Sequence, residues 1–514
     1  MDIELQKMGV RDFFKGRNVF VTGGTGFMGK VLIEKLVRSC PGIGQIYILV
    51  RNRKGKDIKD RIKEMCNVQL FDTIKSRSPG LLEEKLVPVL GNMTDLRLGL
   101  SDKDYSMLVE NVSVIFHAAA SVRFDEPIRD ATIMNVRGTR EVVQLAKDIK
   151  NLAVLLHVST AYCNCNRIKV DEKVYESPMN WRDAIAIAEN MDPTLSSILT
   201  KKFLGSFPNT YTLTKLFAEQ IINEERYNIP SVIFRPSIVI SSYNDPVSGW
   251  LDNFNGPIGL MVACGKGIVR VTLAGKTIIP DYMAVDVSVK AMIVAAWDRA
   301  TSSPGNNGLL PVYNSASVSK SISNNQLTEM GLKFMQFYPF EIMMWRPQIS
   351  ITSCYYYYYT ATLLQQVLPS ILVDGLLNIF GIPHKQLLGL QKKIYIMTMA
   401  LSYFTTQSWS FQNTKFLSLI DKIPEVDHEE FNYDFKNIDQ EQFFENALLG
   451  AQKYMFNVDT KRFPIARRNL WRLTWLDRLV QVIAVVLLVW LLIQFDVIPC
   501  TYLQYISYWF KPSA

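Results

Sequence analysis

The chain of 514 residues has few histidines and cysteines, and neither type is arranged as metal ligands. The histidines are scattered along the sequence: His117, His157, His384 and His428. The seven cysteines are an odd number, and the nearest pair, Cys163 and Cys165, is spaced C-x-C, whereas redox and zinc sites typically use C-x-x-C. We therefore expect no metal site, and we interpret the cysteines as reduced thiols in a cytosol-facing protein.

The chain also lacks a strong excess of one charge and an apolar leader. Its 56 Lys and Arg against 48 Asp and Glu give a formal net charge of +8, without a basic run interleaved with aromatics. This balance does not indicate a nucleic-acid-binding protein, whereas an anionic cofactor, an anionic substrate or a membrane surface fits it. The first residues, MDIELQKMGVRDFFKGR, carry charges throughout, so we expect no secretory signal and a chain that begins in the cytosol.

Alternating strand and helix patterns fill the first part of the chain. From Asn18 an apolar strand pattern is followed by glycines, a helical pattern and a second apolar run, which is a βαβ unit. Further buried-strand patterns are KLVPVLG, VSVIFHAAA, AVLLHVSTA and SVIFRPSIVI. This alternation predicts an α/β fold, with a Rossmann-type doubly wound parallel sheet covered by helices.

The composition changes after this region. Residues 314–326 are rich in Ser and Asn and predict a linker, and the aromatic, apolar residues beyond it predict a mainly helical region. The length of the chain exceeds the ~250 to 300 residues of a single core. We therefore divide it into a Rossmann-type domain over residues 1–325, a helical domain over 326–475 and a membrane segment over 476–514.

The membrane segment is predicted from residues 479–495, LVQVIAVVLLVWLLIQF, which carry no charge. This length is at the short end of the ~17 to 25 residues that cross a bilayer, and a buried core helix would show the same pattern. Aromatic residues resembling interfacial belts favour the membrane: Trp471, Trp475, Trp490, Tyr502, Tyr505, Tyr508 and Trp509. Basic residues gather on the amino-terminal side, which places the bulk of the protein in the cytosol. The five tyrosines at 355–359 are interpreted as packing or membrane-interface residues.

A glycine pattern near the start predicts a dinucleotide site. TGGTGFMG places Gly23, Gly26 and Gly29 after a strand and at the head of a helix. Such glycines let the backbone turn tightly and approach a pyrophosphate, whose charge is met by the helix N-terminus. Thr22, Phe27 and Met28 belong to the same predicted cofactor-binding loop.

The end of the second predicted strand bears on which nicotinamide cofactor is used. It is followed by Arg51, Asn52, Arg53 and Lys54, without a carboxylate. A cation there accommodates a 2′-phosphate, so this favours NADP(H). A solvated basic loop is the alternative interpretation.

The segment YTLTK places Tyr211 and Lys215 one turn apart on a predicted helix. Such pairs are common on exposed helix faces, but this one follows a cofactor loop. A free phenol has a pKa near ~10, so we expect the Lys215 ammonium to lower the pKa of Tyr211 and also to hold the cofactor ribose. Tyr211 then supplies a hydrogen bond or proton to the oxygen that gains charge, and Ser159 or Thr160 shares that load.

Together these motifs resemble the extended short-chain dehydrogenase/reductases, and more closely the alcohol-forming fatty acyl-CoA reductases, especially those of insects. The segments that carry the resemblance are VFVTGGTGFMGKVLIEKLVRSCP, IFHAAASVRFDEP, NVRGTREVV, HVSTAYCN, YTLTK and RPSIVISSYNDPVSGWLDNFNGPIGL. The helical region after residue 330 is similar to the family's carboxy-terminal male sterility domain. The resemblance implies reduction of a long-chain fatty acyl-CoA by two NADPH to a primary alcohol and CoA, on the cytosolic side of the endoplasmic reticulum or peroxisome membrane.

The resemblance also implies roles for individual residues. The three glycines would hold the pyrophosphate, Arg51 the 2′-phosphate, and His117 and Ala118 would line the cofactor. The catalytic group would be Ser159 or Thr160 with Tyr211 and Lys215. His117 is alternatively a strand-end histidine satisfied by local hydrogen bonds.

Two positions depart from the family pattern, and two other functions stay open. Asn92 stands where an aspartate is usual, and Lys290 where an asparagine is common; both concern cofactor or substrate contacts. An extended reductase or epimerase acting on a sterol or sugar nucleotide would share the glycines and the Tyr/Lys pair. An inactive, membrane-anchored binding protein would keep the fold without turnover.

Overall fold

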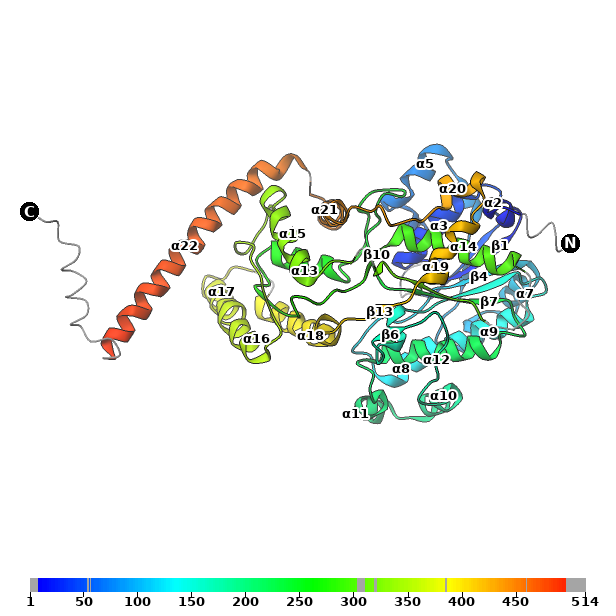
Figure 1. Ribbon diagram of the computed structural model, residues 1–514, viewed down its shortest axis with the longest axis horizontal. Coiled ribbons are helices and arrows are strands. Elements are labelled where there is room, and N and C mark those ends of the chain that lie inside the picture. Colours follow the sequence, from blue (N-terminus) through cyan, green and yellow to red (C-terminus); the bar gives the residue numbers. More distant parts are fainter. Residues whose placement is uncertain are drawn as a thin grey trace, which may run out of the picture.

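The computed structural model describes residues 8–52, 55, 57–302, 310–318, 321–383, 386–458 and 460–495. Several residues named above lie outside these ranges: Arg53, Lys54, His384, Tyr502, Tyr505, Tyr508 and Trp509. A parallel sheet lies near one end of the molecule, and the long helix α22 (Phe463–Gln494) projects from the other end (Figure 1).

The sheet has seven strands in the order β11-β7-β5-β4-β1-β2-β3, and every neighbouring pair is parallel. The strands are β1 (Asn18–Thr22), β2 (Ile46–Val50), β3 (Leu86–Leu90), β4 (Val112–His117), β5 (Val154–Val158), β7 (Ser231–Pro236) and β11 (Val312–Ser315). The strand order reverses between β1 and β4, and in such sheets a ligand crevice opens at the carboxyl ends of the strands beside this point. The predicted Rossmann-type sheet is confirmed.

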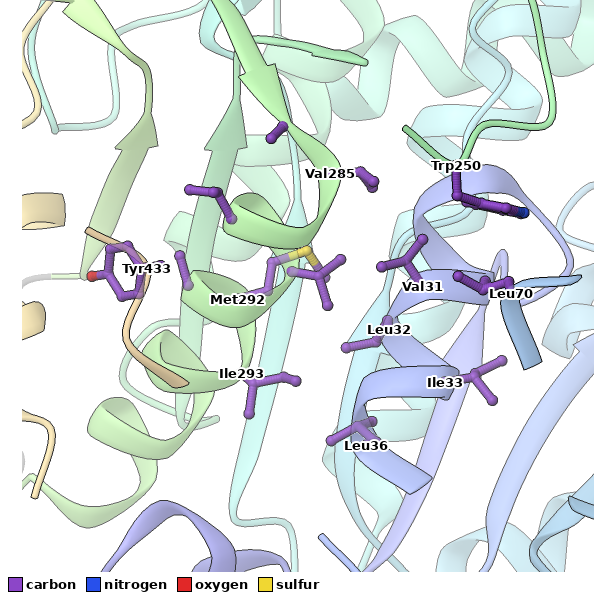
Figure 2. Packing of buried hydrophobic residues seen from close by; sticks show 14 of the residues in the cluster. Val31, Leu32, Ile33, Leu36, Leu70, Trp250, Val285, Met292, Ile293 and Tyr433 are labelled. Atoms are coloured by element: carbon purple, nitrogen blue, oxygen red, sulfur yellow. The ribbon is translucent and has the colours of Figure 1, made fainter. Parts of the chain in front are cut away.

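Helices cover both faces of the sheet. The helices α3 (Phe27–Ser39) and α14 (Val285–Thr301) pack together on one face, and α9 (Gly138–Asp148) and α12 (Thr210–Glu224) on the other. Figure 2 shows Leu32 and Leu36 of α3 pointing toward Met292 and Ile293 of α14. Each fully buried side chain of this kind contributes about 1.5 to 3 kcal/mol of transfer free energy. This packing therefore fixes the position of α3, whose first residue follows the glycine loop.

The prediction of a linker over residues 314–326 is wrong at both ends, because β11 includes its first two residues and the helix α15 (Asn324–Phe337) begins at Asn324. Asn314 and Ser315 are buried in β11, and the Asn314 amide donates to the carbonyls of Val170 (3.2 Å) and Gln412 (2.8 Å). The composition suggested a solvated loop. The Asn314 side chain instead forms its hydrogen bonds with residues that are far away in the sequence.

The region beyond is mainly helical, as predicted. Its longer helices are α15 (Asn324–Phe337), α16 (Tyr355–Thr362), α17 (Leu368–Ile379), α18 (Leu387–Thr405) and α21 (Gln440–Gly450). The chain then returns to the sheet domain, where β13 (Ser410–Phe411) pairs with β6 (Lys169–Val170) and α20 (Glu425–Phe431) packs on α14. Because the two parts share one core, the division at residues 326 and 476 stays a prediction.

Among the residues that the structure describes, two helical stretches are long and apolar enough to cross a membrane, Tyr355–Ile379 and Phe463–Gln494. The second contains most of the predicted span at residues 479–495, and its side chains are largely exposed, unlike those of a core helix. In the first, Tyr358 is buried against β9 (Val271–Leu273), while Tyr355, Tyr356, Tyr357 and Tyr359 are exposed.

Candidate active site

A cavity of about 1550 Å³ opens at the carboxyl ends of the parallel strands. Its wall contains residues that directly follow β1, β2, β4 and β5, as the strand order requires. The cavity brings together most of the predicted site residues: Gly23, Gly26, Phe27, Met28, Gly29, Arg51, Ala118, Ser159, Thr160, Tyr211 and Lys215. Thr22 and His117 are buried and are not among the residues that line it.

The glycine loop leaves no room for a side chain at Gly23 or at Gly29. Gly23 has a φ of +76°, and a Cβ there would lie 2.7 Å from the backbone nitrogen of Ala119. A Cβ on Gly29 would lie 2.2 Å from the carbonyl oxygen of Gly23. Gly26 precedes the first residue of α3, so the free N–H groups of this helix end face the cavity. This bare backbone at a helix N-terminus fits the pyrophosphate of a dinucleotide.

His117 forms a hydrogen bond with Thr22, the residue that precedes the glycine loop. The Thr139 hydroxyl donates to the Asn135 carbonyl (2.7 Å), so His117 Nε2–H donates to Thr139 Oγ1 (3.0 Å). His117 Nδ1 then accepts from the Thr22 hydroxyl (2.7 Å). Burial lowers the pKa of His117 to about 3 and keeps the ring neutral. The sequence left two interpretations of His117, a cofactor-lining residue and a strand-end histidine satisfied by local hydrogen bonds. The contacts observed are those of the second interpretation.

Two guanidinium groups lie at the rim beyond β2. Arg51 is exposed in the cavity wall, and Arg61 of α4 (Ile58–Cys66) donates to the Arg51 carbonyl and lines the same cavity. Asn92 also lines the cavity, and its amide donates to Thr94 Oγ1 (2.5 Å) and Asp95 Oδ1 (3.3 Å). This part of the wall therefore combines positive charge with a neutral amide.

Tyr211 lies in the first turn of α12, which Asn209 caps by accepting from the backbone N–H of Thr212 (2.9 Å). Burial raises the pKa of Tyr211, although a hydrogen bond with the Thr160 side chain acts in the opposite direction. The Lys215 ammonium donates to the Val158 carbonyl (2.7 Å) at the end of β5. The expected lowering of the Tyr211 pKa by Lys215 is therefore not found, because burial dominates and the ammonium group is bound to the strand.

Lys215 is itself perturbed by its surroundings. Burial lowers the pKa of Lys215 to about 8, and the Glu219 carboxylate opposes this effect. The two catalytic hydroxyl candidates differ in their contacts. Thr160 Oγ1 accepts from the Tyr162 N–H (3.3 Å) and pairs with Tyr211, whereas Ser159 lies beside it in the cavity wall. Thr160 thus pairs with the tyrosine, and Ser159 supplies a second hydroxyl in the same part of the wall.

An aromatic cluster behind Tyr211 was missed in the sequence. The Phe124 ring stacks on Tyr211 with centroids 6.0 Å apart, and Phe404 at the end of α18 lies 5.7 Å from Phe124. Phe404 and Trp409 each lie 5.5 Å from the Tyr162 ring. No short-range pattern links residues so far apart in the chain, so only the fold reveals that Phe404 of the helical region packs on Phe124, the ring that stacks on Tyr211.

The departure at Lys290 lies away from the cavity wall. Lys290 pairs with Asp245 (3.2 Å), and Lys35 also pairs with that carboxylate (2.8 Å). The neighbouring Asp286 accepts three backbone N–H groups at 2.9 Å, those of Tyr243, Asn244 and Asp245. Neither Asp286 nor Lys290 lines the cavity, so this departure affects a structural ion-pair cluster.

Solved structures share this architecture. The reductase domain of a nonribosomal peptide synthetase from Mycobacterium tuberculosis matches with a TM-score of 0.58 at 17% identity, covering 88% of this chain and 96% of that domain. The terminal R domain of the myxalamid biosynthetic pathway matches with a TM-score of 0.56 at 18% identity, covering 86% and 92% respectively. At these identities the matches show the fold alone.

Sequence comparison is more specific. Two family profiles, both described as Male sterility protein, match residues 21–292 and 365–458. Fatty acyl-CoA reductase 1 of Xenopus laevis is 36% identical over 467 residues, covering 91% of this chain and 90% of the relative. The human fatty acyl-CoA reductase 1 is 35% identical over 465 residues, covering 90% and 89%. Because these matches span both the sheet with its cavity and the helical region, the chain belongs to the fatty acyl-CoA reductase family.

Proposed function

We propose that this protein reduces a long-chain fatty acyl-CoA to a primary fatty alcohol and free CoA, using two NADPH. The observation that carries the proposal is the single cavity in which the glycine loop, Arg51 and the group of Ser159, Tyr211 and Lys215 come together. Membership of the fatty acyl-CoA reductase family supports the acyl-CoA substrate.

The chain's own residues account for binding of the cofactor. The backbone of the glycine loop and the N-terminus of α3 hold the pyrophosphate. Lys215 binds the ribose, and Arg51 with Arg61 holds the 2′-phosphate, which supports NADPH over NADH. Ala118, which follows β4, lies in the cavity wall beside this path.

A bound nicotinamide would supply hydride to the thioester carbonyl carbon and, after cofactor exchange, to the resulting aldehyde carbon. In each step Tyr211 donates its O–H to the oxygen that gains charge, and Ser159 gives the second hydrogen bond. The C–S bond breaks after the first transfer, and CoA leaves as a thiolate that takes up a proton. Across both transfers, two C–H bonds form on one carbon, the alcohol oxygen takes its proton from Tyr211, which solvent re-protonates, and two NADPH are oxidised.

We also infer that the protein works at the cytosolic side of the endoplasmic reticulum or peroxisome membrane, with α22 as its anchor. The amino-terminal half of α22 carries exposed Arg467, Arg468, Arg472 and Arg478, and its carboxy-terminal half is apolar and exposed. Basic residues on this side favour a cytosolic catalytic domain.

The deciding experiment measures NADPH oxidation by membranes that contain the protein, offered acyl-CoAs of graded chain length, with the lipid products identified. We expect alcohol to accumulate at a preferred chain length, with two NADPH consumed per alcohol. Binding of NADPH without consumption with any thioester would instead favour a sterol or sugar-nucleotide enzyme, or an inactive binding protein.

Arg51 gives the test of cofactor choice. The substitution Arg51→Ser removes a charged hydrogen-bond donor worth about 1.5 to 3 kcal/mol, so we expect KM for NADPH to rise roughly tenfold or more while KM for NADH stays unchanged. Steady-state kinetics with both cofactors measures this difference. Lys59→Ser, which changes an exposed cation on the neighbouring α4, is the matched control and should change neither constant. An equal effect on both cofactors would contradict the 2′-phosphate role.

A further inference from the structure

The cavity has room for more than the cofactor. Its volume of about 1550 Å³ exceeds the ~300 to 1,000 Å³ of a typical pocket for one ligand. The parts assigned to the cofactor are the glycine loop, Arg51 and Lys215. A further stretch of the lining comes from residues 121–137, which follow β4 and include α8 (Ile128–Thr132). We call the cavity-lining residues of this stretch the α8 wall.

The α8 wall lies beside the catalytic tyrosine. Phe124, in the same stretch of chain, is the ring that stacks on Tyr211. The Thr210 hydroxyl donates to the Glu126 carbonyl (3.0 Å), which fixes the segment to the residue next to Tyr211. Glu126 and Arg129 both line the cavity. A ligand whose reacting carbon lies at Tyr211 can therefore extend along these two side chains.

Glu126 and Arg129 each contain a buried polar atom that has no hydrogen-bond partner among the described residues. Glu126 Oε2 is an acceptor, and Arg129 Nε–H is a donor. Buried polar atoms are nearly always hydrogen-bonded, so this pair indicates a ligand that offers both a donor and an acceptor. Arg137 Nε is also without a partner in this part of the structure, but its guanidinium donates to the Thr94 carbonyl, so it belongs to the part of the wall that meets the loop after β3.

The charges of the α8 wall are balanced. Each arginine of the wall pairs with a carboxylate: Arg123 with Asp125 (3.2 Å), Arg129 with Asp130 (3.2 Å) and Arg137 with Glu189 (3.1 Å). Phosphates are drawn to an excess of positive charge, which this wall lacks. An apolar acyl chain would leave Glu126 Oε2 and Arg129 Nε unsatisfied. The wall therefore suits an uncharged segment of a ligand that contains amide groups.

We propose that the α8 wall binds the pantetheine arm of the acyl-CoA, with Glu126 accepting from an amide N–H and Arg129 donating to an amide carbonyl. This rests on the proposed reduction of an acyl-CoA. The arm is the uncharged part of CoA, it contains amide groups, and it is joined directly to the thioester sulfur. A thioester carbon held at Tyr211 therefore brings the arm to this wall, whereas the phosphates of CoA lie at the far end of the arm.

The test uses membranes that contain the full chain, with NADPH and three substrates that share an acyl chain: hexadecanoyl-CoA, hexadecanoyl-pantetheine and hexadecanal. The pantetheine ester lacks the phosphates, and the aldehyde lacks the whole arm. Glu126→Leu removes the acceptor and Arg129→Met removes the donor, whereas Glu126→Gln keeps an acceptor oxygen. Glu176→Leu is the matched control, because Glu176 is exposed and is not among the residues that line the cavity.

We expect KM for hexadecanoyl-CoA to rise about tenfold or more in Glu126→Leu and in Arg129→Met, which is the effect of losing one charged hydrogen bond. The rise should be the same with hexadecanoyl-pantetheine. In both variants kcat/KM for hexadecanal and the Kd of NADPH should stay unchanged, which also shows that the fold is kept. Glu126→Gln and Glu176→Leu should stay near the parent protein with every substrate.

Three results would overturn the proposal. An equal loss with hexadecanal would show that Glu126 and Arg129 support Tyr211 or the fold. A rise in KM that disappears with hexadecanoyl-pantetheine would assign these side chains to the phosphates of CoA. Unchanged kinetics in both variants would show that neither side chain contacts the substrate. If instead the unsubstituted protein reduced neither thioester, the proposed function itself would be wrong, and the pantetheine site would be rejected with it.

Discussion

Tyr211 is held as a neutral hydrogen-bond donor. Its pKa is raised by burial, so the phenol keeps its proton at neutral pH, as the proposed donation to the substrate oxygen requires. Thr160 fixes the direction of its hydroxyl, and Phe124 supports the ring from behind. Acid catalysis by such a group depends on its placement more than on a low pKa.

Tyr211→Phe removes the donor and preserves the stacked ring. We expect kcat for acyl-CoA reduction to fall by ~10² to 10⁴, the usual contribution of a positioned acid, while the Kd of NADPH stays unchanged. Turnover assays and NADPH fluorescence titration measure the two quantities. Full activity in this variant would refute the acid role.

The titration of Lys215 should make the use of NADPH depend on pH. Burial lowers the pKa of this ammonium to about 8, so its charge is half lost at that pH and is nearly complete only about one pH unit lower. If that charge holds the ribose, kcat/KM for NADPH should be flat below about pH 7 and fall towards tenfold per pH unit above about pH 9. Lys215→Arg keeps the charge at all these pH values and should remove the decline. A decline that persists in the arginine variant would assign it to another group.

At the scale of elements, the turn between β1 and α3 depends on how closely its backbone packs. A Cβ at Gly29 would lie 2.2 Å from Gly23 O, whereas a Cβ at Gly26 would lie 3.2 Å from the same atom. The first separation requires backbone movement, and the second only a small shift. The three glycines of the motif therefore do not contribute equally.

Gly29→Ala should abolish NADPH binding and lower the thermal unfolding temperature, because the loop must move. Gly26→Ala should weaken NADPH binding with a smaller effect on stability. The control is Gly375→Ala in α17, where nothing lies within 4 Å of the added Cβ and helix propensity favours alanine by ~1 kcal/mol. Equal losses at residues 26 and 29 would contradict this ranking.

Local patterns made these elements predictable. The glycine spacing, the buried strands and the Tyr211 helix depend on residues close in sequence, so the sequence predicted them correctly. The Asn314 segment was assigned to a linker because its partners, Val170 and Gln412, are remote. The same limitation hid Phe404. The pKa of Tyr211 was misjudged because burial, which no spacing reveals, outweighs the neighbouring charge.

At the scale of the whole molecule, Glu172 joins the two parts of the chain. Its buried carboxylate accepts from three backbone N–H groups, those of Asn314 (3.2 Å), Lys415 (2.5 Å) and Phe416 (2.8 Å). The Lys415 ammonium returns a hydrogen bond to the Glu172 carbonyl (2.9 Å). The helical region is thereby bonded directly to the edge of the sheet domain.

Glu172→Ala leaves three buried donors without their acceptor, each costing about 1 to 3 kcal/mol. We expect a clear drop in the thermal unfolding temperature and faster proteolysis near residue 415. Glu176→Ala, at an exposed position nearby, should stay within about 0.5 kcal/mol of the parent protein. If the two variants unfold alike, Glu172 does not hold the parts together.

The pairing of β13 with β6 also has an evolutionary consequence. The two family profiles match residues 21–292 and 365–458 as separate blocks, yet the strand pair and the Glu172 contacts require residues of both blocks to fit one another. In a chimera that joins the first block of one relative to the second block of another, the two sides of this interface come from different proteins and do not match. Diversification by substitution within one co-inherited chain is therefore favoured over recombination between its halves.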